Sequence, residues 1–167
     1  EHKLADKVAA GWMARAVRLL ADEPESPEHG YLSRWASLTA LAQGDYEGAL
    51  SLAREALAIG ERQRDPNVQA LALMQEGAVL VRMGKVAEGM SLMDEAIGRA
   101  TEMGRPVLYV PGVDEIQELQ TIASILILGH VSETVAKYGA AIKVPCMIPI
   151  VMAVAEEVVR EGFVRAG

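Results

Sequence analysis

The chain has 167 residues, of which 51% are hydrophobic and 4% aromatic, and a formal net charge of −7. This hydrophobic content is enough for a packed core and excludes a wholly disordered chain. The acidic balance repels phosphate backbones, so direct nucleic-acid binding is not expected. Cys146 is the single cysteine, which excludes an internal disulfide and agrees with a reducing, cytoplasmic location.

Membrane and metal chemistry are also not expected. The longest apolar runs, 125–128 and 148–155, are far shorter than the ~20 residues needed to cross a bilayer. The three histidines have no carboxylate or cysteine at ligand spacing, so neither a metal nor another cofactor is predicted. The chain begins at Glu1 with no leader pattern, which leads us to expect an excerpt from a longer protein.

The first hundred residues contain an internal repeat. After a helical segment that ends near Leu20, the residues around Gly44 recur around Gly84, at an offset of 40 residues. Each repeat predicts two antiparallel helices with a glycine in the turn between them. The predicted helices are 30–42 and 46–59 in the first repeat, and 67–83 and 86–101 in the second.

The sequence GDY at 44–46, followed by Ala49, Ala53 and Ala56, resembles the second-helix pattern of tetratricopeptide repeats. More narrowly, GWMARA at 11–16, EHGYL at 28–32 and VAEGM at 86–90 are similar to the repeat region of bacterial LuxR-type transcriptional regulators. This resemblance covers about residues 1–97 and implies a sensing or assembly role. The DNA-binding module of such regulators has no counterpart in this chain.

The second half has a different pattern. A β-rich run at 106–110, a helix over 114–138, a run at 141–144 and a helix over 150–165 give the order strand, helix, strand, helix. Strands alternating with long helices predict parallel pairing. The predicted fold class is therefore mainly α, with tetratricopeptide-like antiparallel helix pairs in 1–97 and a small βαβα Rossmann-like half-domain in 98–167.

A second resemblance lies in this half, in residues 105–112 (RPVLYVPG), 120–123 (QTIA) and 156–162 (EEVVREG). These segments are similar to the opening of an uncharacterised bacterial and archaeal α/β domain found in larger membrane-associated proteins. The resemblance covers about residues 94–167 and implies no assigned activity. Two partial families that meet near Ile97 suggest an engineered or recombined chimera.

Two sets of candidate site residues follow. The first helix of each repeat would supply a concave binding surface for a protein or peptide, with Tyr31, Arg34, Gln75 and Arg82 as its contacts. The alternative is a small-molecule or nucleotide site at the strand ends, formed by Pro111, Gly112, Asp114 and Cys146.

The alternative has weak points. Asp114 would cap a helix and repel phosphate, and the thiol of Cys146 has no histidine base expected nearby. We therefore expect a non-enzymatic interaction scaffold. Because too few repeats and an unfinished sheet leave apolar faces uncovered, we also expect a homo-oligomer. A chimera with no selected function is the third possibility.

Overall fold

The computed structural model describes residues 2–111 and 119–167 and is mainly helical. The chain forms two compact units, Glu1–Met93 and Asp94–Gly167, and the division between them falls inside one helix. This division lies a few residues before the domain boundary expected after residue 97. Each unit is described separately.

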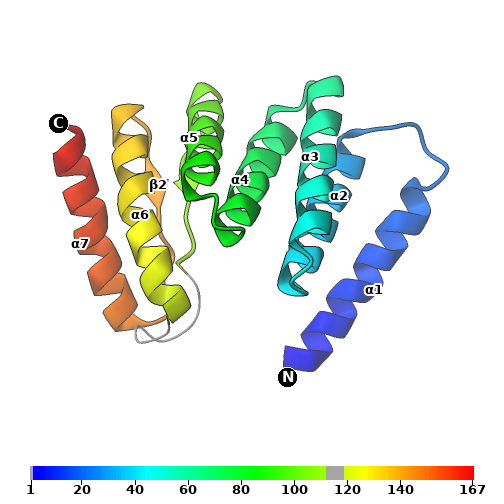
Figure 1. Cartoon of the computed structure of the whole chain (residues 1–167), viewed down its shortest axis with the longest axis horizontal. Helices are drawn as coiled ribbons and strands as arrows, with labels where there is room; N and C mark the ends of the chain where they lie inside the picture. Colours follow the sequence, from blue (N-terminus) through cyan, green and yellow to red (C-terminus); the bar gives the residue numbers. More distant parts are fainter. Residues whose placement is uncertain (1, 112–118) are drawn as a thin grey trace. The chain divides into compact units, whose positions relative to one another are not determined.

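The first unit is a series of helices joined by short turns (Figure 1). Helices are found at all four ranges predicted for the two repeats, with bounds that differ by at most a few residues. The helices are α1 (His2–Leu20), α2 (Pro27–Ala42), α3 (Tyr46–Arg62), α4 (Pro66–Arg82) and the first part of α5 (Val86–Glu102).

The turns explain why these helices end and begin where they do. Gly44 and Gly84 adopt φ angles of 81° and 83°, the left-handed conformation that glycine reaches without a Cβ penalty. Asp45 caps α3 and Asp65 caps α4, because each carboxylate accepts a hydrogen bond from the backbone N–H three residues later, at 2.9 and 2.8 Å. The glycines thus allow the turns that follow α2 and α4, and the aspartates stabilise the first turns of α3 and α4.

Consecutive helices in this unit run antiparallel. Between α2 and α3, the Ser37 hydroxyl donates to the carbonyl of Ala49 at 2.7 Å, while Gly30 lies near Ile59 at the other end of the pair. The predicted alanine stripe on α3 is confirmed, because Ala49, Ala53 and Ala56 are all fully buried. Small side chains let the neighbouring helices approach closely.

Helices α2 and α4 run parallel to each other. A Cβ placed on Gly30 would lie 2.6 Å from a methyl group of Val68, and Gln75 donates to Ser37 at 3.1 Å. In both pairs the α4 residue lies 38 positions after its α2 partner. Because this offset is the same at two points about two helical turns apart, the two helices run in the same direction. The first helices of the two repeats therefore lie side by side.

Helices α4 and α5 approach through glycine. A Cβ on Gly77 would lie 2.7 Å from the carbonyl oxygen of Gly89, and a Cβ on Gly89 would lie 2.5 Å from the carbonyl of Gly77. Met93 closes the contact on one side and Val81 on the other. Because both obstacles are backbone atoms, this crossing has no room for a side chain at either glycine.

Substitution of Gly77 by alanine tests this contact. Overpacking is expected to destabilise the chain by about 1–3 kcal/mol, more than the gain in helix propensity returns. The matched control is Gly11→Ala, because a Cβ at Gly11 meets nothing within 4 Å. Thermal melts should show a lower midpoint for Gly77→Ala and no decrease for Gly11→Ala; equal midpoints would contradict the close approach.

An ion pair joins the segment before α2 to the end of α3. Arg62 donates from Nε and Nη2 to the two carboxylate oxygens of Glu25, at 3.0 and 2.6 Å, and Gln63 donates to the same carboxylate. The Arg62 guanidinium, followed by Gln63, lowers the pKa of Glu25 from 4.5 to about 2. Because the folded value is the lower one, the pair stabilises the fold above pH 4.5, and this contribution is lost as the pH falls toward 2.

Replacement of Arg62 by methionine should raise the pKa of Glu25 from about 2 toward 4.5, because the main hydrogen-bond donor is removed. An NMR titration of the side-chain carboxyl carbons measures this value directly. Arg64→Met serves as the control, since Arg64 has no contact with this carboxylate among the described residues. A Glu25 that titrates near 4.5 in the unmodified chain would contradict the pairing.

The second unit has the predicted order of strand, helix, strand and helix. After the end of α5 come β1 (Val107–Leu108), α6 (Leu119–Lys137), β2 (Ile142–Lys143) and α7 (Pro149–Ala166). The predicted parallel pairing is confirmed, with Val107 opposite Ile142. The strands are shorter than expected, and prolines at 111 and 145 lack the N–H groups that would extend the ladder beyond them.

Helix α6 packs against α7 (Figure 1), and both contribute to one apolar core. The contact is tightest at Gly162, where a Cβ would lie 2.7 Å from the Cβ of Ser132. Tyr109, just after β1, donates its hydroxyl to the carbonyl of Ser124 at 2.7 Å and so attaches the sheet to α6. Leu108 points the other way and is 66% exposed.

The second half of α5 is tied to α6 by a carboxylate. Asp94 accepts hydrogen bonds from the ring Nε2 of His130 at 2.8 Å and from the hydroxyl of Thr134 at 3.0 Å, both through the same oxygen. His130 and Thr134 lie one turn apart on α6, so they reach the same acceptor. The Nε2 of this histidine is therefore engaged by Asp94 within the second unit.

Candidate partner-binding surface

Apolar side chains are exposed where α2 and α4 lie side by side. We call this surface the α2–α4 face and define it by Tyr31, Arg34 and Leu38 on α2 and Leu71 on α4. The three apolar residues are 40%, 38% and 37% exposed, in chain order. Tyr31 and Leu71 occupy equivalent positions of the 40-residue repeat, so both first helices present a large apolar side chain at the same point.

The register between the helices places these residues together. On α4, Leu71 lies between Val68 and Gln75, the two residues that contact α2. On α2, Arg34 lies between Gly30 and Ser37, the two residues that contact α4. Three and four residues along a helix return to the same broad side, so Arg34 and Leu71 both lie beside the line where the helices meet.

Arg34 is the unusual member of this face. The residue is partly exposed, but its Nε is buried and has no hydrogen-bond partner in the described part of the chain. Burial lowers the pKa of the Arg34 guanidinium. The ion pairs found in the described part of the first unit do not include Arg34: Glu25 pairs with Arg62, and Glu76 pairs with Arg54 at 2.7 Å.

Two predicted contact residues lie elsewhere. Gln75 is buried, with 4% exposure, and its amide donates to the Ser37 hydroxyl, so this side chain packs between the helices and does not lie on the exposed face. The cause is the parallel packing of α2 on α4, which covers this position. Arg82 is exposed at the end of α4 and lines a cavity of about 500 Å³ together with Asp45 and Glu47.

The alternative ligand site is only partly described. Pro111 is buried, whereas Gly112 and Asp114 lie outside the described residues. Cys146 lines a cavity of about 260 Å³ between β2 and α7, with Met152 and Glu156 among its neighbours. Burial raises the pKa of the Cys146 thiol, which disfavours the thiolate that a nucleophile requires.

Metal ions and membranes gain no support from the described residues. No group of three or more His, Cys, Asp or Glu side chains in 2–111 and 119–167 lies close enough to hold a metal ion. Within the same ranges, no helix combines the length and the hydropathy that a membrane crossing requires.

The fold thus defines a mainly helical protein with one small parallel sheet. Over residues 70–167 the chain matches the family described as a domain of unknown function, DUF6754. The match covers more than half of the chain, so the protein belongs to this family. Searches of curated proteins and of solved structures gave no match.

The family match begins within α4 and runs through 94–97, the segment where two families were expected to meet. The match therefore includes the end of the helical repeats as well as the βαβα segment. The tetratricopeptide and LuxR-type resemblances, and the chimera, stay predictions.

Sequence reasoning missed several of the residues that form these features. Leu38 and Leu71 were not selected, although Leu71 follows from Tyr31 through the repeat offset. The pairing of Glu25 with Arg62 spans 37 positions and has no sequence signal. The contact of His130 with Asp94 likewise depends on how two helices pack.

A Gln75→Ala substitution should destabilise the chain by about 1–3 kcal/mol, because a buried hydrogen bond is lost and a small cavity remains. Urea denaturation measures this change in the free energy of unfolding. Gln43→Ala is the control, since Gln43 is exposed at the end of α2. If Gln75→Ala proved no more destabilising than Gln43→Ala, Gln75 would not be a buried structural residue.

Proposed function

We propose that this protein is a non-enzymatic interaction scaffold that binds a protein or peptide segment on the α2–α4 face. The observation that carries the proposal is the exposure of Tyr31, Leu38 and Leu71 on two adjacent parallel helices. Exposed apolar side chains gathered in one place are typical of docking surfaces, whereas singly scattered ones are not.

The proposed architecture is tetratricopeptide-like, similar to the repeat region of LuxR-type regulators. Antiparallel consecutive helices, parallel first helices and left-handed glycines in equivalent turns all support this proposal. In such an arrangement the first helices line one surface, and an apolar segment laid across them contacts side chains from both.

Self-association is a further proposal. In the second unit Leu126, Met147 and Val164 are 74%, 78% and 73% exposed, so large apolar side chains are accessible to another surface. We favour a second copy of the chain for this role, in agreement with the homo-oligomer predicted from the sequence.

The Rossmann-like assignment of the βαβα segment is proposed on its parallel strand order.

A library of displayed random 12-residue peptides, selected on the full chain, tests the partner-binding proposal. Selected peptides should bind Leu71→Asp and Leu38→Asp at least about tenfold more weakly, because each variant places a charge in the apolar contact. Isothermal calorimetry with synthetic peptides measures the affinities, and circular dichroism confirms that the variants are folded.

The matched control is Leu108→Asp, which makes the same substitution at an exposed leucine of β1 that has no part in either proposed contact. Peptide affinity should be unchanged in this variant. Peptides that bind all three variants as tightly as the unmodified chain would contradict the α2–α4 face as the binding surface. Failure to select any peptide would count against the proposal as well.

A further inference from the structure

The α2–α4 face combines exposed apolar side chains with a guanidinium that lacks an ion-pair partner among the described residues. Arg34 is held there by the register of the helices, between the Gly30–Val68 and Ser37–Gln75 contacts. A partly buried cation has lost part of its hydration without an opposite charge in return. A binding partner that carries an anion beside apolar side chains would pair with this guanidinium and cover the exposed apolar residues around it.

The chemistry of arginine narrows the choice of anion. A guanidinium presents Nε–H and Nη–H donors in a planar fork that matches the two oxygens of a carboxylate. The Arg34 Nε is buried without a hydrogen-bond partner in the described part of the chain, so at least this donor of the fork is unused. A turn of the flexible Arg34 side chain toward the open side of the face would present both donors.

We propose that the partner segment carries an aspartate or glutamate between apolar residues, that its carboxylate pairs with Arg34, and that its apolar side chains contact Tyr31, Leu38 and Leu71. This inference rests on the proposed function and names the chemistry of the partner. The chain as a whole has a charge of −7 and repels acidic segments, so attraction at this face depends on the local cation. Arg34 would thus set both the position and the specificity of binding.

The peptides selected on the full chain give the test. They should contain Asp or Glu flanked by apolar residues, and each should bind Arg34→Met at least about tenfold more weakly. Replacing the acidic residue of the peptide by its amide should give a similar loss on the unmodified chain and little further loss on Arg34→Met. This double-mutant cycle isolates the pairing of the carboxylate with Arg34 from other contacts.

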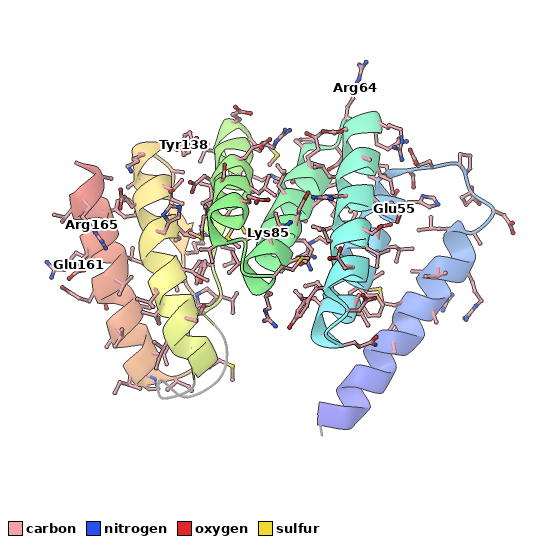
Figure 2. The ribbon with its side chains drawn as sticks, viewed as in Figure 1. Glu55, Arg64, Lys85, Tyr138, Glu161 and Arg165 are labelled. Atoms are coloured by element: carbon pink, nitrogen blue, oxygen red, sulfur yellow. The ribbon has the colours of Figure 1, made fainter. Side chains whose placement is uncertain are left out.

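Two controls keep the test specific. Arg34→Met retains the apolar stem and removes an unpaired charge, so its melting temperature should not fall. Arg64→Met removes a cation at the turn after α3, where the side chain extends away from the helices (Figure 2), and should leave peptide affinity unchanged. An equal loss in both variants would indicate a general charge effect and overturn the inference.

The failure of this inference differs from the failure of the proposed function. Peptides without acidic residues that depend on Leu71 but bind Arg34→Met normally would overturn the carboxylate pairing and leave the face as the binding surface. Peptides that are indifferent to both Leu71→Asp and Arg34→Met would overturn both proposals.

Discussion

The close approach of helices through small residues is the constraint on which this structure depends. On α3 a stripe of buried alanines faces its neighbours, α4 meets α5 at Gly77 and Gly89, and α7 meets α6 at Gly162. The chain is only 4% aromatic, so its interior is filled by bringing backbones together rather than by inserting large rings. Each unit applies the same solution with different residues.

This manner of packing decides where larger side chains go. Because the contacts between α2, α3 and α4 are occupied by Gly30, Ser37 and Ala49, bulky residues such as Tyr31 and Leu71 lie along the rim of the contact. The α2–α4 face is therefore a by-product of tight packing as well as a candidate binding surface. Arg34 shares this position and is partly exposed.

Much of the fold could be predicted from the sequence, because its signals are local. Gly44, Gly84, Asp45 and Asp65 determine the turns and caps, and the apolar periodicity determines the helices between them. The order of strands and helices in the second half also predicts the parallel pairing of β1 and β2. The extent of the strands could not be predicted in the same way, because it depends on which N–H groups meet a partner across the sheet.

The site was less accessible to prediction, since it depends on which side of a helix another helix covers. Gln75 and Leu71 lie one turn apart on α4, yet the first is buried against Ser37 and the second is exposed. Helical spacing places both on the same broad side and cannot separate them. Which of the two residues is buried depends on how α2 packs against α4, and the 38-residue register between these helices is a property of the three-dimensional structure.

The glycine contact between α4 and α5 also has a thermodynamic consequence. Glycine and alanine have no side-chain rotamers to lose, so burying them costs no side-chain conformational entropy. The cost falls instead on the backbone, because glycine is the most flexible residue in the unfolded chain. Replacing Gly77 or Gly89 by a larger residue would reduce the conformational entropy of the unfolded chain, which by itself favours folding. The same replacement would add a Cβ that the folded contact cannot accept, so this route to higher stability is closed at the crossing.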